Sequence, residues 1–324
     1  MQKIGPWFDE ARTSQDRWSA LPPFSLQTFD TALNAQAIGV RSFDPEIQSE
    51  ARSTLDQLLE LDRTVGALAP AFGVRGGAAN GMAALKRFIA DGLNEYGEKK
   101  ADKSLGAQST LSAWLHFGML SPAQILDDIF DYLGDSENSS TKQNSLFSGL
   151  ELKRPTVAAF VEQLVVRREL AANLCRFNHL YDKWEGLPNW SRASLLKHAS
   201  DTRLWRYSAL ELETAETHDS YWNAAQQQLR KSGFIHNHMR MYWGKKILEW
   251  SKTPEEAFYT AIRLNDRWAL DGRDANGYAG VAWCFGTHDR PWTERPIFGM
   301  VRYMNDKGLE RKFKMAPYLE KWLS

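Results

Sequence analysis

Two tryptophans in one short segment are spaced for a shared chemical role. The segment SGFIHNHMRMYWGKKILEW (232–250) carries Trp243 and Trp250 seven positions apart. Seven residues make two helical turns, so both indoles lie on the same face of a helix. The chain holds 13 tryptophans among 324 residues. Indoles suit a large aromatic core, but they also suit stacking and redox work, and composition alone leaves both interpretations open.

A second candidate is a set of hydroxyl side chains before an apolar helix. The segment GAQSTLSAWLHFG (106–118) places Ser109, Thr110 and Ser112 at the predicted start of that helix. Hydroxyls together with free backbone amides there can bind a phosphate or pyrophosphate. The alternative is a well-capped helix that binds nothing.

Two polar and aromatic segments follow near the C-terminus. LNDRWALDGRDANGYAGVAW (264–283) gathers carboxylates and amides on an irregular, glycine-containing stretch: Asn265, Asp266, Asp271, Arg273, Asp274 and Asn276. WCFGTHDRPWTERPIFGMVRYMN (283–305) mixes bulky apolar and basic residues, which is typical of a pocket wall or a nucleic-acid edge. His236 and His238 form an HxH pair, but residues i and i+2 of a helix point apart, so we predict no metal site.

Helices must position these groups. Helical spacing extends over 45–61, over 83–96 and, more strongly, over most of the chain after Pro155. THDSYW and KTPEE predict helix starts, and KSG predicts a stop. Strand alternation and a βαβ rhythm are lacking, so the predicted fold is all-α, a compact multi-helix domain. We predict an irregular segment or linker over 1–54 and one helical domain over 55–324.

Bulk composition excludes several classes of protein. The 40 basic and 40 acidic residues give a formal net charge of zero, so nucleic acid would have to meet a local basic face. Cys175 and Cys284 are 109 positions apart without a CxxC pair, which favours a reducing, cytoplasmic compartment. A signal-peptide pattern and an apolar run of about 18 residues are both lacking, so we predict no membrane partner.

Taken together and in order, seven segments resemble the photolyase/cryptochrome family, and within it the class II cyclobutane pyrimidine dimer photolyases. They extend from about residue 55 to the C-terminus. The segments are LDRTVG (61–66), LSAWLHFGMLSP (111–122), FVEQLVVRRELAANLCRFN (160–178), THDSYWNAAQ (217–226), MRMYWGKKILEW (239–250), LNDRWALDGRDANGYAG (264–280) and ERPIFGMVRYM (294–304). The resemblance implies a photolyase-type helical domain that binds FAD as its cofactor and UV-damaged DNA as its partner.

The resemblance also implies which residues hold FAD. An ion pair of Arg240 with Asp271 is expected over the flavin, and Asn265 is expected to face flavin N5, with Asn276 as a second candidate. A polar amide there can adjust to the protonation states of N5. The other implied contacts are the diphosphate-binding turn Ser109, Thr110, Leu111 and Ser112, the phosphate-contacting Tyr96, and Arg168 facing the cofactor.

The resemblance also implies which residues transfer electrons and which bind the substrate. Trp243, Trp222 and Trp250 match the class II electron-transfer chain, with Trp243 nearest the flavin and Trp222 between or beside the other two. The family flips its lesion out of the duplex. The residues implied on the substrate side are Gln163, Arg167, Tyr207, Met241 and Trp283. Further candidates for DNA contact are Arg290, Arg295, Arg302, Lys307, Arg311, Lys312 and Lys314.

Three departures separate this sequence from the family pattern. The N-terminal α/β domain of the family does not precede the helical segments, so we expect no antenna site here; a separate antenna-domain protein is a candidate partner. Gln163 stands where class II members have a glutamate, which keeps hydrogen bonding and loses acidity. Asn237 replaces a usual glycine; an asparagine there is expected on the flavin side, as in the other photolyase classes.

These observations lead to one main function and three alternatives. The main prediction is light-driven repair of pyrimidine dimers by an electron from photoexcited reduced FAD. The first alternative is a cryptochrome-like photoreceptor, which needs the tryptophans but not the lesion pocket. The second is a subunit whose α/β half comes from another polypeptide. The third is a helical scaffold with a flavin site that has lost its activity.

Overall fold

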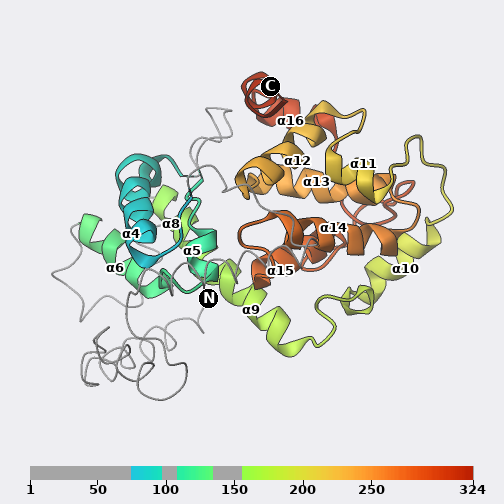
Figure 1. Cartoon of the computed structure of the whole chain (residues 1–324). Helices are drawn as coiled ribbons and strands as arrows, with labels where there is room; N and C mark the ends of the chain where they lie inside the picture. Colours follow the sequence, from blue (N-terminus) through green and yellow to red (C-terminus); the bar gives the residue numbers. More distant parts are fainter. Residues whose placement is uncertain (1–73, 97–107, 134–154, 324) are drawn as a thin grey trace, which may run out of the picture. The chain divides into compact units, whose positions relative to one another are not determined.

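The computed structural model describes residues 74–96, 108–133 and 155–323, and every one of them lies in a single compact unit of the chain. These residues form helices joined by loops (Figure 1). Their only β-type pairing is an isolated bridge between Arg295 and Gly299. The all-α prediction is therefore confirmed for this part of the chain, whereas the proposed boundary at residues 54 and 55 lies outside it.

The described helices follow one another with short breaks. In chain order they are α4 (Ala78–Arg87), α5 (Ser112–His116), α6 (Pro122–Leu133), α8 (Pro155–Val161), α9 (Arg168–Phe177), α10 (Asn189–Lys197), α11 (Ala209–Thr214), α12 (Ser220–Ser232), α13 (Asn237–Trp250), α14 (Pro254–Trp268), α15 (Ala275–Cys284), α16 (Asp306–Lys312) and α17 (Ala316–Leu323). A π-helical turn, Glu162–Arg167, joins α8 to α9 without a break. Such turns are frequent at functional sites, and this one carries two residues predicted to face the substrate.

Local signals in the sequence start and stop the helices as expected. The Asp219 side chain accepts a hydrogen bond from the backbone N–H of Trp222 and begins α12, while Gly233, at φ 70°, ends it. Thr253 caps α14 in the same way, with Pro254 as its first residue. Caps of this kind satisfy backbone groups that the helix leaves unpaired.

Helix α13 lies at the centre of the core. It packs against α12, α14 and α15 (Figure 1), and most of its residues are buried. A helix buried on nearly all sides tolerates large side chains only where its neighbours leave room. Gly244 supplies the closest approach, because a Cβ there would lie 2.6 Å from the Cys284 sulfur on α15.

One cation is enclosed by this packing. Lys245 is 1% exposed, and its ammonium donates a hydrogen bond to the backbone carbonyl of Cys284. Burial lowers the pKa of Lys245 to about 8, because a charge loses its hydration in the core. The hydrogen bond ties α13 to the end of α15. Within the described ranges, no helix combines the length and the apolarity that crossing a lipid bilayer requires.

Candidate functional site

Three buried indoles form a connected row between α12 and α13. The rings of Trp222 and Trp243 are parallel within 2°, with centroids 6.4 Å apart, and Trp250 meets Trp222 edge-on at 5.6 Å. Each side chain is at most 2% exposed. Trp222 therefore contacts both tryptophans of α13, which is the position expected from the sequence. Their role in electron transfer stays a prediction.

Hydrogen bonds hold the inner pair in place. The indole N–H of Trp222 donates to the backbone carbonyl of Trp243 at 3.0 Å, and that of Trp243 donates to Gln226 Oε1 at 2.8 Å. The Lys246 ammonium lies 5.5 Å from the centroid of the Trp250 ring, a favourable contact for a neutral indole. The two hydrogen bonds thus orient the Trp222 and Trp243 rings, and the Lys246 ammonium beside Trp250 is itself ion-paired with Glu249, 2.8 Å away.

Polar groups from α13, α14 and the segment after α14 meet beside the core. Arg240 donates a hydrogen bond to the side-chain oxygen of Asn265, which is 2% exposed. Its other terminal nitrogen lies 3.8 Å from Asp271 Oδ1. That carboxylate oxygen is buried and has no hydrogen-bond partner among the described residues. Buried polar atoms normally have hydrogen-bond partners, so Asp271 Oδ1 keeps the capacity to accept one from a ligand; its contact with a cofactor stays a prediction.

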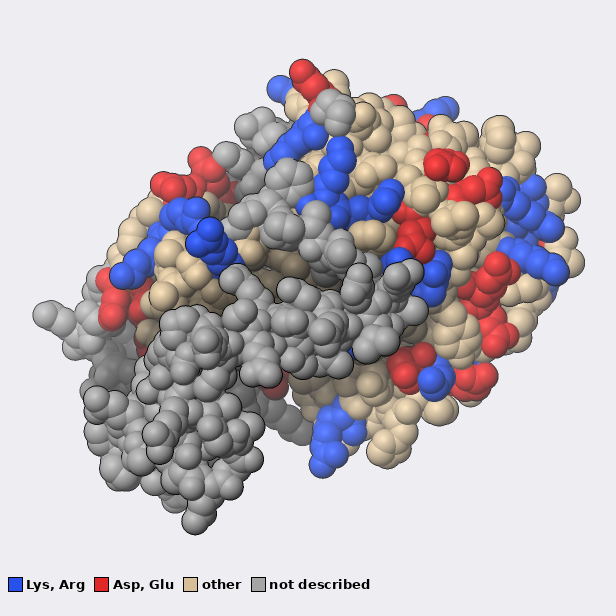
Figure 2. Space-filling model, in the orientation of Figure 1, with Lys and Arg blue, Asp and Glu red and all other residues tan. Residues whose placement is uncertain are grey.

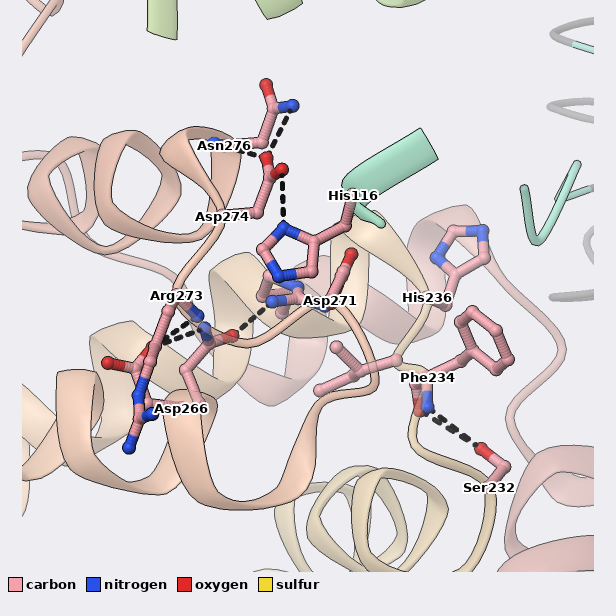
Figure 3. Close-up of polar contacts among 12 residues, drawn as sticks. His116, Ser232, Phe234, His236, Asp266, Asp271, Arg273, Asp274 and Asn276 are labelled. Atoms are coloured by element: carbon pink, nitrogen blue, oxygen red, sulfur yellow. Dashed lines mark hydrogen bonds and ion pairs between the residues drawn. The ribbon is translucent and has the colours of Figure 1, made fainter. Parts of the chain in front are cut away.

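A second polar group surrounds Asp274, the N-cap of α15. Its Oδ1 accepts from the backbone and side-chain N–H groups of Asn276, at 2.9 and 3.1 Å. Its Oδ2 lies 3.0 Å from His116 Nδ1 (Figure 3). The Arg168 guanidinium lies 3.9 Å from the same oxygen. Asn276 and Arg168, both predicted to contact the cofactor, are therefore joined through Asp274. Neither His116 nor Asp274 was a predicted site residue; the polar composition of 264–283 was the only signal for Asp274.

The predicted diphosphate turn has an unusual backbone. Thr110 lies in the left-handed region at φ 54°, and its hydroxyl donates to the carbonyl of Ser109 at 2.8 Å. Leu111 is buried, and Ser112 is the first residue of α5. A threonine at positive φ is strained, and such strain concentrates at functional sites. Phosphate binding by this turn stays a prediction.

Tyr96 packs against two phenylalanine rings. Its ring packs edge-on against Phe88 and Phe160, with centroids 5.9 and 5.2 Å away. Burial raises the pKa of its hydroxyl. The described contacts join Tyr96 to these rings and not to the turn at 109–112, so its expected phosphate contact stays a prediction.

The predicted substrate residues separate into two groups. Gln163 and Arg167 lie exposed on the π-helical turn, and the Arg167 guanidinium is 5.6 Å from the centroid of the Trp283 ring. Met241 lies on the same side of the α13–α15 contact as Cys284, with the two sulfurs 4.0 Å apart. Arg167 thus contacts α15 at Trp283, and Met241 contacts it at the neighbouring Cys284. A shared substrate pocket stays a prediction.

Tyr207 has different neighbours. Its ring meets Trp250 edge-on at 5.3 Å, and its hydroxyl lies 2.6 Å from His218 Nδ1. The described contacts of Tyr207 therefore lie at the end of the tryptophan row, and not beside Trp283. The sequence could not distinguish these positions, because Tyr207 is in a loop without helical periodicity.

The start of α13 also differs from expectation. The helix begins at Asn237, so His236 is its N-cap and lies just before it, where its Nδ1 accepts from the backbone N–H of His238. Both imidazoles contact Phe313, at 5.8 and 4.9 Å. Burial lowers the pKa of each histidine to about 4. The argument that the two point apart along one helix was therefore wrong, because only His238 is helical.

The remaining predictions about the site concern metal binding and Asn237. Among the described residues, no three His, Cys, Asp or Glu side chains are arranged to hold a metal ion. Asn237, expected on the flavin side, has an exposed side chain at the first position of α13, and its contact with a cofactor stays a prediction.

Comparison with known proteins identifies the family. No protein-family model matches the sequence. The chain is 43% identical over 247 residues to the deoxyribodipyrimidine photo-lyase of Methanothermobacter thermautotrophicus, which covers 76% of this chain and 51% of that protein. It is 43% identical over 264 residues to the deoxyribodipyrimidine photo-lyase of Potorous tridactylus, covering 81% of this chain and 46% of that protein.

The fold agrees with that match. The structure aligns with the cryptochrome of Synechocystis at a TM-score of 0.54 and 16% identity, covering 78% of this chain and 46% of the cryptochrome. At that identity the likeness shows the fold alone. The chain spans about half the length of the curated relatives it matches. The chain belongs to the photolyase/cryptochrome family, and its described residues have the helical fold of that family.

Proposed function

We propose that this chain is the FAD-binding helical part of a light-driven DNA-repair flavoprotein of the class II cyclobutane pyrimidine dimer type. The observation that carries the proposal is the row of three buried, mutually contacting indoles, whose inner helix α13 also bears Arg240. Four relatives about 43% identical are deoxyribodipyrimidine photo-lyases. The lesion chemistry and the class II assignment are taken from that resemblance.

The residues present fit FAD. Asp271 Oδ1 is buried and has no hydrogen-bond partner among the described residues, and it forms an ion pair with Arg240, which also donates to the buried Asn265. Together they offer a cation, an anion and an amide, which match the donors and acceptors at the edge of a flavin. When bound, FAD supplies the one-electron chemistry that amino-acid side chains lack.

Further residues would complete the cofactor site. Arg168 lies beside Asp274, which also holds Asn276. In our proposal, Arg168 neutralises phosphate charge and Asn276 contacts the flavin side. The turn that would bind the diphosphate consists of Ser109, Thr110, Leu111 and Ser112, with Tyr96 and Asn237 as additional contacts.

The chain's own contribution to electron transfer is positional. Aromatic rings this close can exchange electrons: the centroid distances are 5.6 Å from Trp250 to Trp222 and 6.4 Å from Trp222 to Trp243. Burial excludes water from the row, and fixed surroundings keep the reorganisation that accompanies each transfer small. The parallel rings of Trp222 and Trp243 and their hydrogen bonds keep that geometry constant.

The lesion would meet the region where Arg167 covers Trp283. Trp283 and Met241 offer apolar and aromatic surface for a flipped pyrimidine dimer, while Gln163 and Arg167 offer hydrogen bonds. Flipped bases are recognised in this way, by stacking and by hydrogen bonds to their edges. Tyr207 lies elsewhere in its described contacts, so we leave it out of this pocket.

DNA would contact arginine-flanked aromatic side chains in the loop after α15. Arg290 and Arg302 lie 5.5 and 5.0 Å from the Trp292 ring centroid, and Arg295 lies 4.0 Å from that of Tyr303. Aromatic and arginine side chains that alternate in this way suit unstacked bases. On the face in Figure 2, blue and red side chains are interspersed, so local contacts rather than a broad positive field would hold the DNA.

One specific observation favours a second function. Gln163, which replaces a glutamate of the class II pattern, cannot ionise. A cryptochrome-like photoreceptor would keep the tryptophan row and would not need an acid at the lesion. It would photoreduce its flavin and leave pyrimidine dimers intact.

One experiment separates these functions. The purified protein is loaded with FAD, reduced, and illuminated with single- or double-stranded DNA that contains cyclobutane dimers. Light-dependent loss of dimers supports repair. Flavin photoreduction without dimer loss supports the photoreceptor. A protein that fails to bind FAD would contradict both.

A further inference from the structure

The loop after α15 contains a turn with a strained residue. Ile297 has φ 68°, in the left-handed region, where a β-branched side chain is strained. An isolated backbone bridge between Arg295 and Gly299 closes the turn. The same loop bears Trp292 and Tyr303, the aromatic rings that arginine side chains cover. Strain of this kind persists only where surrounding contacts hold it, so the turn depends on residues outside the loop.

Two side chains from α10 and the segment just after it hold the backbone of this turn. Asp201 Oδ2 accepts a hydrogen bond from the Ile297 N–H at 2.8 Å. Ser194 Oγ accepts one from the Met300 N–H, also at 2.8 Å. Ser194 is buried, and it belongs to α10. The strained residue is therefore held by a carboxylate that the loop itself does not supply.

His198 connects that carboxylate to the loop a second time. Its Nδ1 lies 2.6 Å from Asp201 Oδ2, the oxygen that also accepts from Ile297. Its Nε2 lies 3.0 Å from Glu294 Oε1, three residues before Ile297 in the loop. Both ring nitrogens thus face carboxylates, and only the imidazolium carries an N–H donor on each nitrogen. Hydrogen bonding to Asp201, then to Glu294, raises the pKa of His198.

The charges around His198 show what its proton contributes. Lys197 donates to Glu294 Oε1 at 2.8 Å, and the buried Arg203 donates to the backbone carbonyl of Asp201 at 3.2 Å. Two carboxylates therefore face two lasting cations and the imidazole. The set carries one positive charge with the imidazolium and none without it. Loss of the proton thus acts by removing one N–H donor and turning a nitrogen lone pair towards a carboxylate oxygen, and not by net repulsion.

We propose that His198 is a positioning residue for DNA binding: its imidazolium holds Asp201 and Glu294 together, and through them the loop after α15. When the N–H bond at Nε2 breaks, the proton passes to water and the contact with Glu294 is lost. The loop then loosens, and Trp292 and Tyr303 lose their fixed positions. This inference rests on the proposed function, because the DNA contacts of this loop belong to that proposal.

The test is the affinity of the FAD-loaded full chain for labelled DNA with one cyclobutane dimer, measured by fluorescence anisotropy at constant ionic strength. Wild-type affinity should be constant below about pH 6.5 and fall about three- to tenfold as His198 deprotonates. His198→Asn cannot titrate, so it should bind weakly without that fall. The matched control is His179→Asn, which replaces an exposed histidine and should keep the fall.

A second variant and a second readout separate titration from simple loosening. Ser194→Ala removes the acceptor of the Met300 N–H and no titratable group, so it should weaken binding at every pH and keep the fall. Hydrogen–deuterium exchange of the full chain without DNA reports on the loop at 290–304. After correction for the intrinsic effect of pH on exchange, its protection should decrease with rising pH in the wild type and in His179→Asn, but not in His198→Asn.

The outcomes are distinguishable. Loop protection that does not change with pH in the wild type, or a fall in affinity that persists in His198→Asn, would overturn the role of His198. So would wild-type affinity that stays constant while the protection decreases. A wild-type protein whose loop protection depends on pH as expected, but which binds no DNA at any pH, would instead overturn the proposed function.

Discussion

At the scale of single residues, buried polar atoms separate structural from ligand-binding roles. Both inner indole N–H groups have acceptors inside the fold, namely the backbone carbonyl of Trp243 and Gln226 Oε1. Asp271 Oδ1 is equally buried and has no hydrogen-bond partner among the described residues. Because unsatisfied buried polar atoms cost free energy, the two indole N–H groups are accounted for by folding. Asp271 Oδ1 has only its ion pair with Arg240, 3.8 Å away, and a bound ligand that donates to it stays our proposal.

Trp243→Phe should stop flavin photoreduction and leave FAD bound. The phenyl ring keeps most of the packing, but benzene is much harder to oxidise than indole, so the row is interrupted. The lost N–H leaves Gln226 without this donor, which costs about 1–3 kcal/mol of unfolding free energy. Absorption spectra under illumination measure the photoreduction. Trp184→Phe, a buried tryptophan outside the row, is the control; equal loss in both variants would contradict the assignment.

Gln163→Glu should accelerate light-driven dimer loss if the chain repairs DNA. A carboxyl group can supply the proton or field that the amide cannot, and such groups contribute about 100-fold or more where they act directly. Quantifying dimers after timed illumination measures the effect. Asn173→Asp adds the same charge at an exposed position of α9 and should change nothing. An unchanged rate in Gln163→Glu, where the wild type repairs, would exclude this position from the chemistry.

At the scale of elements, close contacts between helices and loops determine where side chains meet. Helix α13 approaches α15 at Gly244 and is tied to it by Lys245. This contact sets the position of Met241 relative to Cys284. The loop after α15 is held to α10 by a separate polar contact, in which His198 lies between two carboxylates.

Gly244→Ala should destabilise the fold by forcing α13 and α15 apart. Its Cβ would lie 2.6 Å from the Cys284 sulfur, and overpacking of this kind costs about 1–3 kcal/mol. Chemical denaturation measures the change. Gly280→Ala on α15 meets nothing within 4 Å, so it should be neutral or stabilising by about 0.5–1 kcal/mol through helix propensity. Equal effects of the two substitutions would contradict the close packing.

The contact around His198 should make stability depend on pH. His198 Nδ1 lies 2.6 Å from Asp201 and Nε2 lies 3.0 Å from Glu294, which also bonds Lys197. Hydrogen bonding to Asp201, then to Glu294, raises the pKa of His198. A histidine whose pKa is raised by folding contributes its full stabilisation at pH values below its unfolded pKa, which is about 6.5. That contribution is lost as the pH rises through the folded pKa.

The same contact lowers the pKa of Asp201 and of Glu294, chiefly through hydrogen bonds from the Ile297 N–H and from Lys197 respectively. The two carboxylates contribute to stability at pH values above their unfolded pKa values, which are about 4. This contribution is lost as the pH falls through their folded pKa values. Urea unfolding of wild type and His198→Asn across pH tests this. The stability advantage of the wild type should be largest between about pH 4.5 and 6; an advantage that grows towards pH 8 would contradict the argument.

At the scale of the whole molecule, the helical fold and the proposed cofactor are thermodynamically linked. The proposed site draws on α9, α13, α14 and the segments before α5 and α15, so FAD would bind only when these are folded together. A ligand that binds the folded state alone raises the unfolding free energy with its concentration. The net charge of zero and the interspersed charges on the face in Figure 2 imply that the DNA of our proposal would be held by local contacts.

FAD should raise the thermal midpoint, and Asp271→Asn should reduce that shift. At about 100 times the dissociation constant, FAD adds about 2.7 kcal/mol to the unfolding free energy. Asp271→Asn removes the ion pair with Arg240 but keeps the size of the side chain, so the FAD-free variant should lose little stability. Thermal unfolding with and without FAD measures both effects. A destabilised FAD-free variant with an unchanged FAD shift would place Asp271 in the fold rather than in the site.

Much of the fold could be predicted because its signals are local. Apolar spacing, Asp219 and Thr253 as caps, and Gly233 as a stop each act within one or two helical turns. The seven-residue spacing of Trp243 and Trp250 likewise required only a helix. The π-helical turn at Glu162–Arg167 and the start of α13 after His236 could not be predicted, because both depend on how neighbouring elements pack.

By itself, the sequence determined the all-helical class, the family resemblance and the residue types that can carry electrons and bind FAD. Tertiary structure alone decided which of those residues meet. It placed Trp222 against both tryptophans of α13, left Asp271 Oδ1 without a hydrogen bond among the described residues, and put Tyr207 beside Trp250 and His218. The physical reason is range: periodicity and capping depend on neighbours along the chain, whereas contacts between helices depend on packing of residues far apart in sequence.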